Sequence, residues 1–125
     1  MLFAIALGGA AGSVARYGVG SFLDRGEGAF PVGTLIVNIA GCLLLGFLVR
    51  YFTGSMMSTE LRAALTIGFC GGFTTFSTYA LDVNRLLQMG QFTRATLYAS
   101  ASVLLSVTAL MWGISVGRAI ARAMR

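Results

Sequence analysis

Long apolar stretches dominate this chain and predict helices that cross a membrane. A helix needs around 20 apolar residues to span a bilayer core about 30 Å thick. Four stretches reach that length, at about residues 2–22, 31–52, 61–87 and 93–120. Because the polar pieces between them are short, we expect one all-α integral membrane domain over residues 1–125, with four transmembrane helices and no second domain.

The third stretch contains a segment that is poorly suited to a continuous helix. Two adjacent glycines precede four hydroxyl-bearing residues within Gly71–Thr78. Gly costs about 1 kcal/mol relative to Ala in a helix, and Ser and Thr side chains compete for backbone hydrogen bonds. We therefore expect the third helix to be broken mid-membrane, over Gly71–Thr74, where unpaired backbone is tolerated if it lines a cavity or binds an ion. The alternative is a continuous helix in which the hydroxyls bond to the preceding turn.

Composition and charge narrow the classes of function. Hydrophobic residues make up 57% of the chain and charged residues 10%, whereas soluble domains carry about 25% charged residues. The net charge is +5, and all nine basic residues are Arg. Most of them flank the apolar stretches, which favours membrane lipid over nucleic acid as their partner.

The residues needed for common enzyme chemistry are missing. The chain has no His, which excludes a Ser-His-Asp triad and a Cys/His zinc site. Cys42 and Cys70 lie in apolar runs, so we expect them to be packing residues rather than a disulfide or reactive thiols. Asp82 is the only carboxylate within a predicted span and has no partner acid or base there. We therefore expect that the chain is not an enzyme.

Arg residues are divided almost evenly between the two sides of the predicted bundle. Five lie on the side of the N-terminus and three on the other, with Arg16 nearer the second side. Since Arg-rich loops stay in the cytoplasm, so weak a bias permits both orientations and hence two-fold antiparallel dimers. A single orientation with a cytoplasmic N-terminus is the alternative.

Neutral polar and aromatic side chains occur inside the predicted spans. Asn38 needs a hydrogen-bond partner there, either another helix or an anion and water in a pathway. Tyr98, Ser102 and Ser106 follow at four-residue intervals and so share one helix face, as interhelical contacts or as a pathway lining. Phe73, Phe76 and Tyr79 recur every three residues. They form either a packing stripe or a set of ring edges whose positive potential attracts a small anion.

Three patterns together resemble the Fluc/CrcB family of fluoride channels. They are GGAAGSVARY at residues 8–17, GTLIVN at 33–38 and GGFTTFST at 71–78. The resemblance covers the whole chain, in order and at the right spacing, and the third pattern is highly specific. It implies a multi-pass protein of the bacterial cell inner membrane that exports fluoride by passive conduction. It also implies an antiparallel dual-topology homodimer with two pores.

The resemblance further implies roles for individual residues. The expected fluoride-pore residues are Asn38, Thr75, Phe76, Ser77, Tyr79, Tyr98, Ser102 and Ser106, with Arg16 matching the family's Arg in the first helix. The backbone carbonyls of Gly71 and Thr74, from both subunits, would hold a structural sodium ion. Tyr79 stands where the family usually has Phe, so its hydroxyl can donate a hydrogen bond, and Asp82 stands where the family often has Glu.

Two other functions fit part of the pattern. Small multidrug-resistance proteins also have four helices and dual topology, but they exchange protons at a carboxylate in the first helix, which this chain lacks. A structural subunit of a larger complex would explain glycine pairs such as Gly8 and Gly12 by close helix packing. It would not explain the polar cluster at the expected break.

Overall fold

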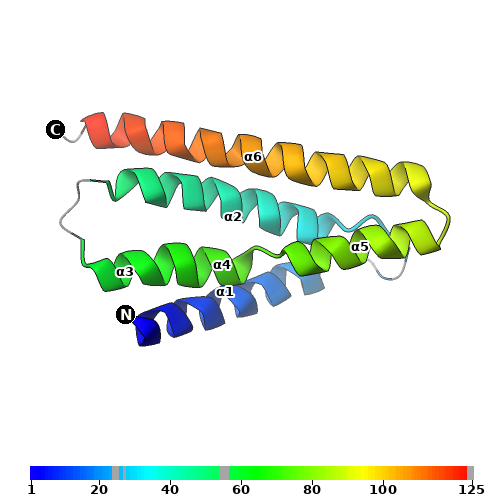
Figure 1. Cartoon of the computed structure of the whole chain (residues 1–125), viewed down its shortest axis with the longest axis horizontal. Helices are drawn as coiled ribbons and strands as arrows, with labels where there is room; N and C mark the ends of the chain where they lie inside the picture. Colours follow the sequence, from blue (N-terminus) through cyan, green and yellow to red (C-terminus); the bar gives the residue numbers. More distant parts are fainter. Residues whose placement is uncertain (24–25, 27, 54–56, 124–125) are drawn as a thin grey trace.

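The computed structural model describes residues 1–23, 26, 28–53 and 57–123, and its secondary structure there is entirely helical (Figure 1). The helical segments, in chain order, are α1 (Leu2–Leu23), α2 (Val32–Tyr51), α3 (Thr59–Ala63), η1 (Ala64–Cys70), α4 (Gly71–Phe73), α5 (Phe76–Gln88) and α6 (Phe92–Ala123). Here η1 is a π-helix. The segments α3, η1 and α4 follow one another without a gap, and together with α5 they form the third of the four predicted helices. The all-α class with four helices is therefore confirmed.

Three of the helices are long and apolar enough to cross a membrane: α1, α2 and α6. The third predicted helix is divided by a break, so neither of its halves has the length of a full span. The α6 helix has 32 residues, which corresponds to about 48 Å at a rise of about 1.5 Å per residue. It therefore extends beyond a hydrocarbon core of about 30 Å.

The break in the third helix lies later than the sequence suggested. Gly71 has helical dihedrals (φ −65°, ψ −36°), and Gly71–Phe73 is helical. Extended backbone is found at Thr74 (φ −75°, ψ 155°) and Thr75 (φ −150°, ψ 118°). The predicted break over Gly71–Thr74 was thus wrong for its first three residues and right for Thr74. Glycine permits a helix break without forcing one. Here the position of the break is determined by the hydrogen bonds of Thr75 with Asn38 and Thr78.

Glycines bring the helices into close contact. A Cβ atom on Gly46 of α2 would collide with the Leu110 carbonyl of α6, and one on Gly113 of α6 would collide with the Leu43 carbonyl of α2. On the other side of the bundle, Gly12 of α1 lies against the Phe69 carbonyl of η1 in the same way. The glycine spacing in α1 is therefore used for packing within the chain.

Large apolar side chains are exposed along the outside of the bundle. Phe22 is 89% exposed, Leu2 82% and Phe3 77%. The buried apolar residues form two small clusters, one around Leu48 and the other around Tyr98. An apolar exterior around a small core is the pattern expected of a protein embedded in a membrane.

The glycine contacts between α2 and α6 generate a test of the fold. Gly46→Ala should lower the free energy of unfolding by about 1–3 kcal/mol, because the atoms that the new methyl group meets are backbone and cannot rotate away. The control is Gly18→Ala, since a Cβ there meets nothing within 4 Å, and it should be neutral or stabilising by up to about 1 kcal/mol. Equilibrium unfolding in detergent micelles measures both, and equal stabilities would contradict the packing described.

Candidate functional site at the helix break

Asn38 of α2 forms two hydrogen bonds with the backbone of Thr75 at the break. Its Nδ2 donates to the Thr75 carbonyl at 3.0 Å, and its Oδ1 accepts from the Thr75 N–H at 2.8 Å. In a continuous helix that N–H would instead bond to the Gly71 carbonyl, four residues earlier. Of the two alternatives left open for Asn38, the structure shows the contact to another helix. The bond to the Thr75 carbonyl is the only one that the Asn38 carboxamide nitrogen donates among the described residues. The second proton of this nitrogen is therefore available for another acceptor.

The Thr75 side chain explains why a new helix begins at Phe76. Its Oγ1 accepts from the Thr78 N–H at 3.1 Å, which caps the first turn of α5. The same Oγ1 donates to Thr78 Oγ1 at 3.0 Å and lies in a hydrogen bond of 3.2 Å with Ser77 Oγ. The N-terminal end of α5, which carries partial positive charge, is thereby fixed at the break.

The C-terminal end of α4 leaves carbonyl groups at the other side of the break. Cys70 O accepts from both the N–H and the Oγ1 of Thr74, each at 2.9 Å. For the carbonyls of Gly71 and Thr74, no hydrogen bond is found within the part of the chain that the structure describes. That part also holds no cluster of three or more His, Cys, Asp or Glu residues suited to a metal ion. A cation at this end would therefore have neutral oxygen ligands, which suit a hard ion.

A cavity of about 250 Å³ opens beside the break, between α2, α5 and α6. Its lining contains six of the predicted pore residues, namely Asn38, Thr75, Phe76, Tyr79, Ser102 and Ser106. Cys42, Thr74 and two valines complete the lining. The structure thus brings together residues from three helices that the sequence could connect only by resemblance.

Among the described residues, two hydroxyl groups of this lining form no hydrogen bond of good geometry, although Tyr98 lies beside Ser102 and Cys42 beside Ser106. Ser102 is 4% exposed, and the Oγ atoms of Ser102 and Ser106 are buried. A buried polar group left unsatisfied costs about 1–3 kcal/mol. Since both side chains line the cavity, the arrangement suits water or an anion that accepts hydrogen bonds from the two hydroxyl groups.

Phe76 and Tyr79 stand next to each other at the cavity. Their ring centroids are 5.3 Å apart with an interplanar angle of 41°. The Tyr79 hydroxyl donates to the Ala99 carbonyl of α6 at 3.4 Å. The Tyr79 hydroxyl therefore has a backbone acceptor within the chain. The ring of Phe76 remains 78% exposed in the single chain.

Three predicted pore residues do not line this cavity. Tyr98 is fully buried in the core, and Ser77 is exposed beyond the cap of α5. Arg16 borders a separate cavity of about 450 Å³. Thr75 lines both cavities, so the two cavities adjoin at the break.

Sequence reasoning missed the hydrogen-bonded cluster around Asp82. Asp82 Oδ2 accepts from Thr34 Oγ1 at 2.8 Å and from the Tyr98 hydroxyl at 3.3 Å. The partners of this buried carboxylate are thus hydroxyl groups on α2 and α6. Thr34 lies four residues before Asn38 and therefore on the same face of α2, a spacing that could have identified it.

The Asn38 contacts make a prediction about stability. Asn38→Leu should lower the free energy of unfolding by about 2–5 kcal/mol. The substitution leaves the Thr75 N–H without a partner and removes the hydrogen bond to the Thr75 carbonyl. Ser106→Ala is the matched control. It removes a buried hydroxyl that forms no hydrogen bond of good geometry among the described residues, and it should change stability by less than about 1 kcal/mol. Unfolding in micelles measures both, and a neutral Asn38→Leu would show that the break does not depend on this side chain.

Comparison with known proteins agrees with the residue patterns. Residues 3–114 match the family model described as CrcB-like protein, Camphor Resistance (CrcB). A protein of Rhizobium etli (strain CIAT 652) is 48% identical over 124 residues, which covers 95% of this chain and 97% of the relative. A protein of Paracoccus denitrificans is 46% identical, covering 93% of each chain, and one of Chlorobium phaeobacteroides is 40% identical, covering 94% of this chain and 92% of the relative.

All three relatives carry the name fluoride-specific ion channel FluC. Ion channels are not enzymes, so the expectation that this chain is not an enzyme is confirmed. The family resemblance found in the sequence is confirmed as well, over nearly the whole length of the chain. The chain belongs to the CrcB-like family of membrane proteins.

Proposed function

We propose that this chain is a fluoride-selective ion channel that carries fluoride out of the cell by passive conduction. The observation that carries the proposal is a pair of buried hydroxyls, Ser102 and Ser106, in the cavity at the helix break, which form no hydrogen bond of good geometry among the described residues. The names of the relatives, at 40–48% identity over nearly the whole chain, support fluoride as the ion.

The chemistry of the lining suits fluoride. This ion is small and strongly hydrated, so a pathway must supply hydrogen-bond donors in place of water. The two serines, the second N–H of Asn38 and the N-terminal end of α5 are such donors. No described residue of the lining is charged, so no fixed cation holds the ion there. The ring edges of Phe76 and Tyr79 add a weak positive potential.

Assembly with a second copy would complete the pathway. Gly71, Phe76 and Ser77 are exposed in the single chain, although they surround a helix break that cannot face lipid without leaving backbone groups unpaired. An antiparallel homodimer would cover them, and the nearly even distribution of Arg permits both orientations. Each of two pores would then draw on both copies. The compartment we propose is the bacterial cell inner membrane.

The carbonyls of Gly71 and Thr74, for which no hydrogen bond is found among the described residues, support a structural sodium ion between the two copies. Gly71 and Thr74 would supply four carbonyl oxygens from two chains, with no carboxylate. Neutral oxygens suit a hard monovalent cation. The exposed position of Gly71 fits a ligand that faces the partner copy rather than the chain's own core.

Flux through liposomes tests the proposed function. Purified protein in sealed vesicles should release fluoride down its gradient and largely retain chloride, without a proton gradient. Phe76→Ile should reduce fluoride release at least about tenfold, because it removes a polarised ring edge at similar volume. Fluoride electrodes measure the release. Equal release of the two halides, or uphill fluoride movement at a fixed proton stoichiometry, would refute the channel proposal.

Replacing sodium tests the structural ion. In detergent, the fraction of dimer measured by light scattering should fall when sodium is exchanged for N-methylglucamine and recover when sodium returns. Gly71→Leu should abolish this response. A Cβ at Gly71 meets nothing within 4 Å in its own chain. A loss of dimer in Gly71→Leu would therefore arise at the contact with the partner copy. Thr74→Ala should preserve the response, because the proposed ligand is the main-chain carbonyl. A dimer indifferent to sodium would remove the ion from the proposal.

A further inference from the structure

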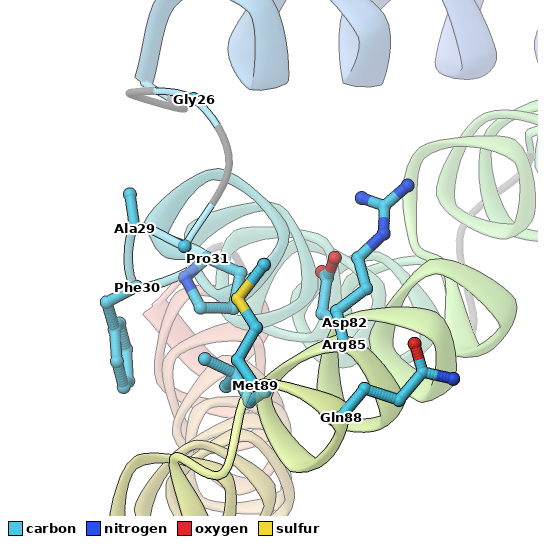
Figure 2. Close-up of a pocket in the computed structure, with 10 residues that line it drawn as sticks. Gly26, Ala29, Phe30, Pro31, Asp82, Arg85, Gln88 and Met89 are labelled. Atoms are coloured by element: carbon cyan, nitrogen blue, oxygen red, sulfur yellow. The ribbon is translucent and has the colours of Figure 1, made fainter.

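A second cavity, of about 500 Å³, lies at the end of the bundle where α5 ends and α2 begins (Figure 2). One wall is the loop that includes Ala29, Phe30 and Pro31, and the other is the last two turns of α5. The side chains of Asp82 and Arg85 both line this cavity, and Figure 2 shows them projecting from α5 to the same side.

The inner end of this cavity is the hydrogen-bonded cluster around Asp82. The carboxylate is 8% exposed and is held by Thr34 of α2 and Tyr98 of α6. Tyr98 lies one helical turn before Ser102 on the same face of α6, and Ser102 lines the cavity at the break. A continuous set of polar side chains therefore leads from this end of the bundle to the proposed fluoride pathway.

Two of the described residues that line the cavity are charged, Asp82 and Arg85, and their charges act on an anion in opposite directions. An anion that enters from this end approaches Asp82, whose charge would repel it. Arg85 follows Asp82 by three residues and so lies on the same face of α5. Its side chain is exposed. Among the described lining residues it is the only cation.

We propose that this cavity is an anion-collecting vestibule at one mouth of the pathway, and that Arg85 attracts small hydrated anions there and offsets the repulsion by Asp82. The inference rests on the proposed function, because it names the group that concentrates fluoride for that conduction path. Arg85 stays outside the narrow cavity at the break, so it acts on the supply of the ion and leaves the choice between halides to other residues.

Ionic strength separates this role from a structural one. Charges at a mouth raise the local concentration of a counter-ion, and salt screens them over about 30 Å at 0.01 M but only about 3 Å at 1 M. At low ionic strength and low fluoride, Arg85→Gln should slow initial fluoride release from liposomes about threefold. The difference should disappear at high ionic strength, while Arg85→Lys should retain most of the rate at both.

Arg94→Gln provides the matched control. Arg94 is also exposed near this end of the bundle, but it borders a different cavity and bonds to Gln91 Oε1 at 3.1 Å. Its substitution should leave the release unchanged at both salt concentrations. Arg85→Gln behaving like this control would overturn the vestibule, and so would an equal loss at low and high salt, which would indicate a structural role. Release by the unsubstituted protein is measured in the same series, so a failure of the proposed function is seen separately.

Discussion

The two hydrogen bonds between Asn38 and the backbone of Thr75 hold the rest of the site in place. They satisfy an N–H that a continuous helix would direct to Gly71, and so they stabilise an interruption that hydrocarbon would otherwise forbid. Because the partner is a side chain of α2, the break is tied to the helix that also carries Thr34. The position of the break thus depends on a tertiary contact and not on local helix propensity.

The break creates two helix ends of opposite partial charge only two residues apart. The C-terminal end of α4 presents carbonyl oxygens, while the N-terminal end of α5 presents amide protons. The first end suits a cation and the second an anion. A single interruption therefore accounts for both ions in the proposed function, although the described residues at the break itself carry no formal charge.

The sequence predicted the helices well because the apolar stretches have membrane-spanning length. It also indicated the region of the break, since adjacent glycines and hydroxyl residues are rare in a stable helix. The break itself begins at Thr74, because the competition between helix and cap is decided by Thr75 Oγ1 and by Asn38, which lies far away in sequence. The pairing of Asp82 with Thr34 and Tyr98 was not predicted for the same reason, since it joins three helices. Most of the cavity residues stood out in the sequence as polar or aromatic side chains within apolar spans, and the resemblance assigned them to one pore. That they line one cavity became visible only in the structure.

The mutual glycine contacts of α2 and α6 have a consequence for ion discrimination. Gly46 and Gly113 fix the spacing of two helices whose side chains, Asn38 on one and Ser106 on the other, form facing parts of the cavity lining. Backbone packs against backbone at these contacts, so no flexible side chain can yield there and the separation of the two helices is constrained. In the proposed channel, two halides of equal charge would then be distinguished by the stiffness of the walls, because a wall that cannot widen cannot adapt its donors to the larger ion.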